Sequence, residues 1–266
     1  MNTEHTFVVC AYKESEFLEE CIDSLVAQTV KSKILMVTST PNDYIKNMAD
    51  KYNLQYYINQ GESGIVQDWN FGYAKAKTPY ITIAHQDDTY EPEYTEKILQ
   101  QLKKSKNPLI AFCDYGEIRN TSKVTDTKML KIKKMMLFPL RNRIFQKSKW
   151  VRRRILSLGD PICCPAVTFV RENLPNPVFQ VRFRAAEDWQ AWERLSRMKG
   201  EFLYIPVPLM YHRIHEGSET SIIIGDNVRT QEDYEMYCMF WPKPIAKLLV
   251  RFYASSQKSN AIKGDM

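Results

Sequence analysis

The sequence predicts an α/β protein with a Rossmann-like, mostly parallel sheet flanked by helices and a C-terminal helical extension. Short apolar runs alternate with helix-like segments over residues 6–113, and this alternation builds βα units whose strands run in parallel. The composition, with 44% hydrophobic and 26% charged residues, is that of a folded globular chain. A length of 266 residues suffices for one large domain or two small ones.

The first half contains five apolar runs that we expect to be strands. They lie at residues 6–11, 33–38, 55–58, 80–84 and 109–113. Between them, apolar residues recur at helical spacing in a segment that follows Ser15 and at 42–52, 65–76 and 92–104. Ser15 is expected to cap the first helix, and Pro92 to open the fourth, where proline is tolerated. The residues expected to face inward from the third helix are Trp69, Gly72, Tyr73 and Ala76.

The second half is less regular. We expect a strand within 160–170, a helix at 187–199, short strands at 202–205 and 208–211, and helices at 226–240 and 244–253. The helix at 187–199 is the best marked, because acids stand at its start and Gly200 follows its end. The expected organisation is one domain over residues 1–220 and a helical extension over 221–266.

Positive charge is concentrated in an insertion at residues 127–155. This segment holds eleven of the 37 lysines and arginines and no acid, and since the net charge is +6, the rest of the chain is mildly acidic. It also contains Phe138, Phe145 and Trp150, and a basic surface with apolar side chains is typical of contact with an anionic phospholipid leaflet. Nucleic acid is the competing partner, and a solvated helical insertion without a partner is the third interpretation.

The absence of several motifs argues against some classes of ligand-binding protein. GxGxxG and GxxxxGK[ST] are both absent, so neither a dinucleotide-binding fingerprint nor a P-loop is expected. The six cysteines form no CxxC pair, which argues against a zinc knuckle, and we expect reduced thiols in a cytosolic protein. No signal peptide is visible, and no run approaches the roughly 20 apolar residues that span a bilayer.

Side chains suited to catalysis or ligand binding gather in three places. They are Asp87 and Asp88 after the fourth expected strand, Glu187 and Asp188 at the start of the helix at 187–199, and His212, Arg213 and His215 in the loop at 211–218. Adjacent carboxylates at a strand end face the ligand crevice of a parallel sheet and suit a hard divalent cation, or they cap the next helix. Acids at a helix start also complement its dipole, and an arginine with histidines binds phosphate or metal.

Four stretches occur in an order that resembles the family 2 glycosyltransferases, whose nucleotide-sugar-binding domain has the GT-A fold. VVCAYKESEFLEECIDSLVAQT is similar to the first strand and helix of the family, and GESGIVQDWNFGYAKAKTPYITIAHQDD to the segment that ends in the DxD motif. EDWQAWERL resembles the ED motif, and YHRIHEGSETS the closing arginine–histidine loop. The resemblance covers residues 6 to about 220.

The resemblance implies a role for each matching residue. The nucleotide-sugar would contact Ala11, Tyr12, Glu14, Thr38, Ser39, Gln86, Asp87 and Arg213, and Mn²⁺ or Mg²⁺ would bind Asp87, Asp88 and His215. Asp188 matches the general base, with Glu187 and Trp189 on the acceptor side, although Trp189 is equally expected in the core. Two departures stand out: His85 replaces the first acid of the DxD motif, and no acid follows the second strand, where the chain reads VTST.

The activity implied is an inverting hexosyl transfer from a nucleotide-diphosphate sugar, with UDP favoured, to a hydroxyl of a glycan or a lipid-linked acceptor. By the same analogy we expect a role in cell-surface polysaccharide synthesis, a cytoplasmic location peripheral to the inner face of the cell membrane, and no nucleic-acid partner. The alternatives are a polyprenyl-phosphate glycosyltransferase of the same fold, a nucleic-acid-binding protein that uses residues 127–155, and an inactive sugar-binding module.

Overall fold

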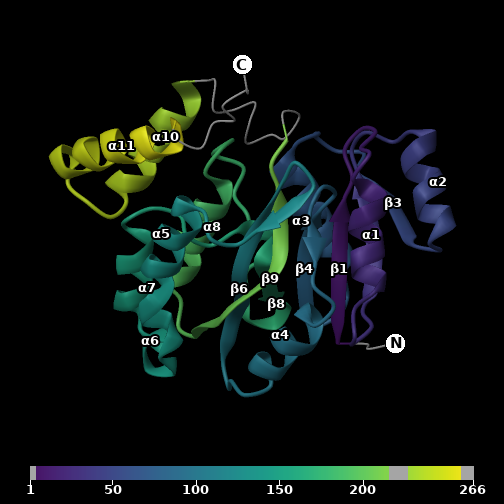
Figure 1. The fold of residues 1–266 in the computed structure, drawn as a ribbon, viewed down its shortest axis with the longest axis horizontal. Helices are drawn as coiled ribbons and strands as arrows, with labels where there is room; N and C mark the ends of the chain where they lie inside the picture. The colour runs from purple at the N-terminus through teal and green to yellow at the C-terminus, as the bar shows by residue number, and fades with distance from the viewer. Residues whose placement is uncertain (1–3, 216–226, 259–266) are drawn as a thin grey trace.

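The computed structural model describes residues 4–215 and 227–258, and these form a mixed sheet with helices on both faces (Figure 1). The strands are β1 (His5–Cys10), β2 (Lys33–Thr38), β3 (Gln55–Ile58), β4 (Tyr80–His85), β5 (Thr89–Tyr90), β6 (Pro108–Arg119), β7 (Ser122–Val124), β8 (Val167–Val170) and β9 (Glu201–Arg213). They pair in the order β3-β2-β1-β4-β8-β6-β9-β5, with β7 added to β6. The α/β fold expected from the sequence is confirmed.

The sheet is parallel in one half and mixed in the other. β3, β2, β1 and β4 are parallel neighbours, as four βα units predict. The fifth expected strand, 109–113, is the first half of the longer β6, and it does not lie beside β4, because the short β8 is inserted between them antiparallel to both. The strand itself was expected within 160–170, but local sequence does not specify which strands it pairs with, so its insertion here was not predicted.

Helices cover both faces of the sheet. They are α1 (Leu18–Val26), α2 (Asp43–Lys51), α3 (Ile65–Lys75), α4 (Tyr94–Leu102), α5 (Lys128–Leu137), α6 (Arg143–Lys147), α7 (Lys149–Leu156), α8 (Glu187–Ser196), α10 (Asn227–Cys238) and α11 (Lys243–Lys258), with short 3₁₀ turns η1 (Phe138–Arg141), η2 (Cys164–Ala166) and η3 (Arg171–Asn173). β1 alternates as a two-sided strand should: Phe7 and Val9 join a core with α1, α2 and α4, and Val8 joins a second core with α3, α7 and α8.

The third helix packs very closely on the sheet. A Cβ atom on Gly72 of α3 would lie 2.3 Å from a methyl carbon of Val8 and 3.1 Å from one of Val37, so a larger residue would push the helix away. Trp69, Tyr73 and Ala76 are buried beside it, which confirms the expected inward face.

Several element boundaries differ from the expectation. α1 begins at Leu18 with Phe17 at the cap position, and the Ser15 hydroxyl accepts a hydrogen bond from the Phe17 amide before the helix starts, so Ser15 is not the cap. α4 begins at Tyr94, two residues after Pro92, so Pro92 precedes the helix and does not open it. Only Val167–Val170 of the segment 160–170 is a strand, because η2 occupies residues before it.

The two short strands expected near residue 205 are one 13-residue strand, β9. It pairs in parallel with β6 and contains irregularities in register, after which its end pairs antiparallel with β5. Two of the three irregularities fall beside the run Ile205-Pro206-Val207-Pro208, where the two prolines have no N–H to donate to the ladder. β9 thereby carries His212 and Arg213 to the residues that follow β4.

The basic insertion folds as α5, η1, α6 and α7, which pack on one another at one side of the molecule, next to α10 and α11 (Figure 1). Within residues 4–215 and 227–258, no helix is both long and apolar enough to cross a membrane. The expected boundary between domain and extension, at residues 220 and 221, lies outside the described residues.

Candidate active site

The candidate site lies at the carboxyl ends of β1, β2 and β4, where ligands bind to parallel α/β sheets. Asp87 and Asp88 follow directly after β4. The end of β9 reaches the same place from the far side of the sheet, because β5, the short strand after Asp88, pairs with it. Residues from both halves of the chain therefore surround this pair of acids.

Asp88 is fully buried and holds the end of β9. Its Oδ1 atom accepts a hydrogen bond from the Arg213 backbone amide and lies 3.0 Å from Nδ1 of His212. Burial lowers the pKa of His212, but the charge and hydrogen bond of Asp88 outweigh it and raise the pKa to about 9, so the pair is an ion pair near neutral pH. The second oxygen, Oδ2, is buried and makes no hydrogen bond.

Asp87 is turned toward the loop that follows β9. Its Oδ2 atom lies 2.9 Å from Nε2 of His215. Burial opposes ionisation of Asp87, but the hydrogen bond with His215 and the charges of His212 and His85 hold the pKa of the carboxyl below its usual value. Asp87 is thus ionised at neutral pH, as a ligand for a cation must be.

Arg213 connects three parts of the site. Its Nε donates to the backbone carbonyl of Asp87 at 2.9 Å, and Nη2 contacts Oε2 of Glu20 at 2.6 Å. The guanidinium also lies over the ring of Phe17, with 4.4 Å between the guanidinium carbon and the ring centroid. In this structure Arg213 links β9 to the start of α1, and its expected contact with a diphosphate stays a prediction. Glu20 was not singled out from the sequence, since it reads as one of several acids early in a helix.

The expected nucleotide side is formed by the turns after β1 and β4. The side-chain amide of Gln86 pairs with the backbone of Tyr12, accepting from its amide at 2.9 Å and donating to its carbonyl at 3.0 Å. The next residue, Lys13, has a positive φ of 53° and its amide donates to the hydroxyl of Thr40. Ala11 is buried, and Tyr12 and Glu14 are exposed beside it. Gln86 therefore fixes the shape of this turn.

The segment after β2 contains hydroxyls where the family has an acid, and a buried carboxylate lies directly beneath them. Asp68 of α3 accepts hydrogen bonds at Oδ2 from the hydroxyl and the amide of Ser39, at 2.7 and 3.2 Å. Its other oxygen accepts from Asn59 at 2.8 Å. Thr38 is buried at the end of β2. Asp68 was missed because a single acid inside an amphipathic helix gives no signal of a site.

His85, which takes the place of the first acid of the DxD motif, faces an aromatic ring. It stacks on Trp69 with 5.2 Å between ring centroids and an angle of 11° between planes. Its Nδ1 atom is 3.8 Å from Oδ2 of Asp88, and Nε2 is buried without a hydrogen-bond partner. The imidazole is therefore held by stacking, with a ring nitrogen left unsatisfied.

The expected catalytic side is the start of α8. Asp188 is half-buried in the first turn, where its Oδ1 atom accepts a hydrogen bond from the amide of Trp189. Glu187 is buried. Trp189, which we placed either in the acceptor wall or in the core, lies in the core: it is 2% exposed and its indole N–H donates to the carbonyl of Leu156.

A second carboxyl group lies beside Asp188 and was not predicted. Asp160 follows Gly159 after α7, and its side chain hydrogen-bonds with that of Asp188. Burial and the charge of Asp188 raise the pKa of Asp160 well above its usual range, so Asp160 holds a proton more readily than an ordinary carboxyl. No sequence signal marked Asp160, because it stands in a loop before a strand.

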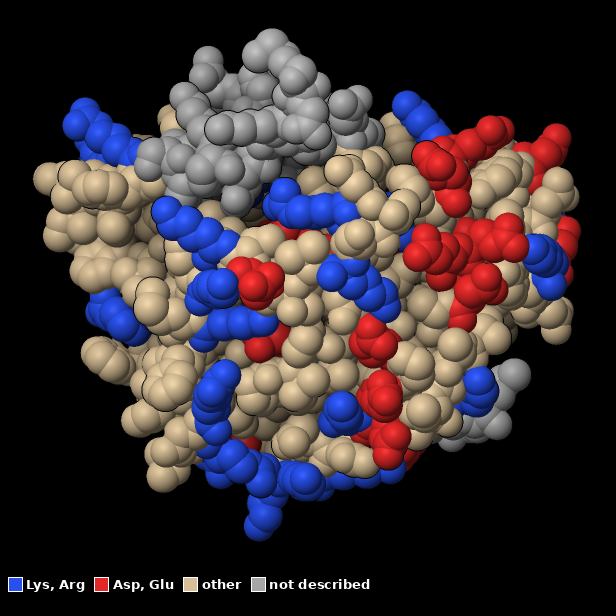
Figure 2. All heavy atoms as spheres, in the orientation of Figure 1, with Lys and Arg blue, Asp and Glu red and all other residues tan. Residues whose placement is uncertain are grey.

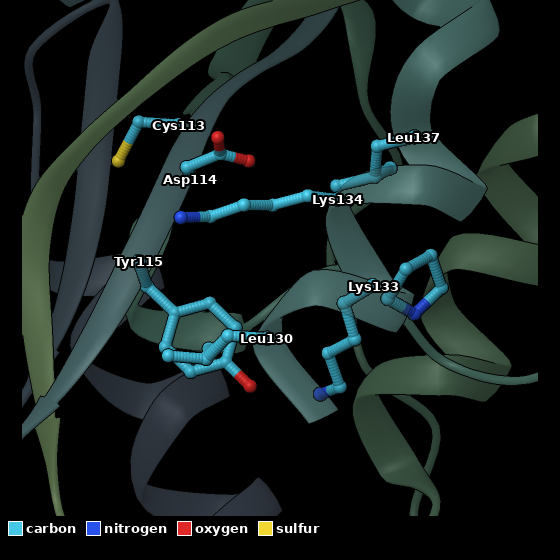
Figure 3. Close-up of a pocket in the computed structure, with 8 residues that line it drawn as sticks. Cys113, Asp114, Tyr115, Leu130, Lys133, Lys134 and Leu137 are labelled. Atoms are coloured by element: carbon cyan, nitrogen blue, oxygen red, sulfur yellow. The ribbon is translucent and has the colours of Figure 1, made fainter. Parts of the chain in front are cut away.

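Cys163 is near enough to both acidic groups for their charges to act on its thiol. Its pKa is raised by burial and by the charges of Asp88, Asp188 and Asp160. Since these charges act on one thiol, the end of β4 and the start of α8 converge around it. The charge of Lys133 in α5 lowers the pKa values of Cys163, Asp160 and His212. The basic insertion therefore lies beside the site. Figure 3 shows Lys133 beside Tyr115, in a small pocket that Pro161 also lines.

Comparison with known proteins supports one family. The model of glycosyl transferase family 2 matches residues 6–171. An uncharacterised glycosyltransferase of Rickettsia typhi is 23% identical over 251 residues, which cover 91% of this chain and 72% of the relative. One of Haemophilus influenzae is 24% identical over 245 residues, which cover 81% and 67%.

Solved structures share the architecture. S. aureus TarS in complex with UDP-GlcNAc aligns with a TM-score of 0.64 and 13% identity over 98% of this chain and 74% of that one. The mannosyltransferase PcManGT from Pyrobaculum calidifontis in complex with GDP-Man and Mn²⁺ aligns with a TM-score of 0.62 and 14% identity over 99% and 76%. Identity this low establishes the GT-A fold alone. Because the family model spans more than half of the sequence, the chain belongs to glycosyl transferase family 2.

Proposed function

We propose that this glycosyltransferase moves a hexosyl group from a nucleotide-diphosphate sugar to an acceptor hydroxyl, with inversion at the anomeric carbon. The observation that supports it is the convergence of two acidic groups from distant parts of the chain. Asp87 and Asp88 stand at the end of β4 and Asp188 at the start of α8, and the charges of Asp88 and Asp188 both raise the pKa of the buried Cys163 thiol. A donor diphosphate at the first group would present its sugar to an acceptor at the second.

The chemistry assigned to Asp188 is that of a general base. It takes the proton from the acceptor hydroxyl as the oxygen forms its bond to the anomeric carbon. The bond from that carbon to the diphosphate oxygen breaks, and the electron pair leaves with the nucleotide diphosphate. A single displacement of this kind inverts the anomeric configuration. In this proposal Asp160, whose pKa is raised by burial and by the charge of Asp188, holds a proton and donates a hydrogen bond to the base.

A divalent cation, Mn²⁺ or Mg²⁺, fits the acids after β4. Among the described residues no three His, Cys, Asp or Glu side chains are grouped so as to hold a metal by themselves. Cations that act on nucleotides are commonly held by one or two carboxylates together with the substrate phosphates. Asp87 and the unsatisfied Oδ2 of Asp88 fit that arrangement, and His215 would favour Mn²⁺ because imidazole suits Mg²⁺ poorly. When bound, the cation neutralises charge on the diphosphate.

The donor is proposed from the site and from what the similar structures contain. TarS was solved with UDP-GlcNAc and with UDP, and PcManGT with GDP-Man. We favour a UDP-sugar, with the turn after β1 and the Thr38–Ser39 hydroxyls on the nucleotide side. Asp68 supports this role because it orients the Ser39 hydroxyl.

The direct test is a thermal-shift screen of UDP-, GDP- and dTDP-sugars with Mn²⁺ present. A donor that binds the folded state stabilises it by mass action and so raises the unfolding temperature. At a donor concentration about one hundred times the dissociation constant, the free energy of unfolding increases by about 2.7 kcal/mol. NMR of the transferred sugar then reports the anomeric configuration. No stabilisation by any nucleotide-sugar would contradict the proposal, and retention of configuration would contradict the single displacement.

The acceptor is proposed to be a glycan or a lipid-linked sugar, used in cell-surface polysaccharide synthesis at the inner face of the cell membrane. The support is the basic, partly apolar insertion beside the site. A polyprenyl-phosphate acceptor is the alternative. Its phosphate is already an anionic nucleophile and needs no base, so it predicts that Asp188 is dispensable.

A further inference from the structure

The apolar side chains that stay exposed are concentrated in two segments, the insertion helices and the last helix. Of fourteen large exposed apolar residues in the described parts of the chain, nine belong to these segments. They are Met135, Phe138, Ile144, Phe145, Trp150 and Leu158 from the insertion and the residues after it, and Ile245, Leu248 and Phe252 from α11. Exposed apolar groups gathered in this way mark an interaction surface rather than ordinary scatter.

Both segments are also basic and free of acids. Residues 127–158 contain eleven lysines and arginines and 241–253 contain three, and neither stretch contains an aspartate or a glutamate. The exposed cations of the insertion are Lys128, Lys131, Arg141, Arg143, Lys147, Lys149 and Arg154. In Figure 2, acidic side chains gather on the opposite side of this view, over α1 and α2, and are sparse beside α5–α7.

Each helix presents its exposed residues as a stripe. In α5 and the turn after it, Lys131, Met135 and Phe138 follow one another at three- and four-residue spacing, whereas Leu130 and Leu137 on the other side are buried. In α11 the corresponding stripe is Ile245, Leu248 and Phe252, interleaved with Lys243, Lys247 and Arg251, and its other side buries Ala246 and Val250. Each helix is therefore anchored by one face and has a second apolar face directed to solvent.

The two segments are joined. The guanidinium of Arg154 in α7 lies 4.7 Å from the ring of Trp241, just before α11, and 5.7 Å from the ring of Trp150. The indole N–H of Trp241 donates to the carbonyl of Ser157 at 2.7 Å. The end of α7 and the residues just before α11 are thus packed together, and both stripes lie on the same side of the protein (Figure 1).

We propose that this side, formed by α5–α7 and α11, docks on an anionic phospholipid leaflet. Positive charge without acids is attracted to the negative headgroups, and the apolar stripes insert at the headgroup boundary. Nucleic acid would be attracted by the positive charge, but its binding would not bury the exposed apolar residues Ile245, Leu248 and Phe252. Because the charge of Lys133 in α5 acts on Asp160, docking of α5 would bring the candidate site close to the surface where a lipid-linked acceptor lies.

The insertion does not contribute all of its charge to this surface. Arg152 is 1% exposed, and its guanidinium donates to the carbonyls of Gly200, Ser196 and Met198. Arg153 is paired with Glu193. A test that removes these two would damage the fold, so exposed residues must be changed instead.

The experiment is flotation of the full chain with vesicles of phosphatidylcholine containing phosphatidylglycerol, at low and at high salt. We expect the parent to float at low salt and less at high salt. Changing Lys131, Arg141, Lys147 and Lys149 to Gln should lower the fraction bound by about tenfold or more. Changing Ile245, Leu248 and Phe252 to Ser should weaken binding at both salt concentrations, since apolar insertion is not screened.

The matched control removes four exposed lysines from the other half of the molecule, Lys31, Lys33, Lys46 and Lys77. It has the same net charge as the four-Gln variant and should float like the parent. The proposal is overturned if the parent stays unbound at low salt, if the control loses as much binding as the four-Gln variant, or if vesicles of phosphatidylcholine alone bind equally well. Tighter binding to duplex DNA than to the anionic vesicles would overturn it in favour of nucleic acid. Binding is measured without turnover, so failure here leaves the proposed transfer reaction untouched.

Discussion

Nε2 of His215 lies 2.9 Å from Oδ2 of Asp87, although 128 residues separate them in the sequence. The same pattern recurs between neighbouring residues, since His212 contacts Asp88 and the Arg213 side chain contacts the Asp87 carbonyl. The Arg213 amide also donates to Asp88, so four polar contacts fasten the end of β9 and the residues just after it to the acids after β4. The carboxylates expected to act on the donor are held in place before any donor binds, which is the preorganisation that a diphosphate site needs.

Asp188→Asn should abolish transfer while leaving donor binding intact. Asparagine keeps the size and the hydrogen bond at the start of α8 but cannot accept a proton. The expected loss of kcat is on the order of 10²–10⁴-fold, as for removal of a general base. Asp43→Asn, which changes the first-turn acid of the remote α2, should turn over like the parent. Near-normal turnover by Asp188→Asn would favour the polyprenyl-phosphate alternative.

Asp160→Asn separates the roles of the two neighbouring carboxyls. Because burial and Asp188 raise the pKa of Asp160, we expect it to hold a proton in the parent, and the neutral amide should replace it with at most a few-fold loss of kcat. Asp160→Ala, which removes the hydrogen bond to Asp188, should lose more. If Asp160→Asn is as inactive as Asp188→Asn, the base has been assigned to the wrong member of the pair.

Asp87→Ala should remove metal-dependent donor binding. Its carboxyl is held ionised in the structure and is the most accessible oxygen ligand after β4. Donor affinity of the parent, measured by calorimetry, should fall when Mn²⁺ is replaced by a chelator, and that difference should vanish in the variant. Asp126→Ala, which removes an exposed acid, should behave like the parent. A parent that binds donor equally well in chelator would show that the metal assignment is wrong.

Arg152→Ala should destabilise the fold by about 2–4 kcal/mol, because three carbonyls around the end of α8 lose a charged donor and a buried space opens. Urea unfolding of Arg152→Ala beside Arg141→Ala, an exposed arginine of the same insertion, measures the difference. The Arg141 variant should stay within about 0.5 kcal/mol of the parent. Equal stabilities would mean that Arg152 is not a structural residue.

His5 should make the protein sensitive to acid. It is fully buried between the hydroxyls of Ser32 and Thr82, and burial lowers its pKa to about 3. Below the usual pKa of about 6.5 the unfolded chain takes up a proton that the folded chain does not, so stability falls as the pH drops from about 6.5 toward 3. The slope attributable to His5 is about 1.4 kcal/mol per pH unit.

The measurement is the free energy of unfolding in urea at several pH values, for the parent and for His5→Asn. Carboxylates contribute to acid sensitivity in both proteins, so the relevant quantity is the difference in slope. The variant should lose stability less steeply between pH 6.5 and 4. Parallel curves would show that His5 becomes protonated in the folded state without cost.

Local sequence determined the elements of the first half and the acids at their ends. Successive side chains of a strand point to opposite faces, so the apolar run of β1 specifies a strand that is buried on both faces. Val8 lies in one core, and Phe7 and Val9 lie in the other. Asp87, Asp88 and Asp188 were found because they stand at ends of elements, which periodicity locates well, and because the ordered motifs resemble a family.

Tertiary structure decided which residues meet. The insertion of β8 between β4 and β6, the burial of Arg152 and Trp189, and the pairs Asp68–Ser39 and Asp160–Asp188 all join positions that are far apart in the chain. A carboxylate inside a helix or a loop has the same local pattern whether it is solvated or buried against a partner. Only packing removes the water around it, and with the water gone its hydrogen bonds and its pKa are set by neighbours that the local sequence does not specify.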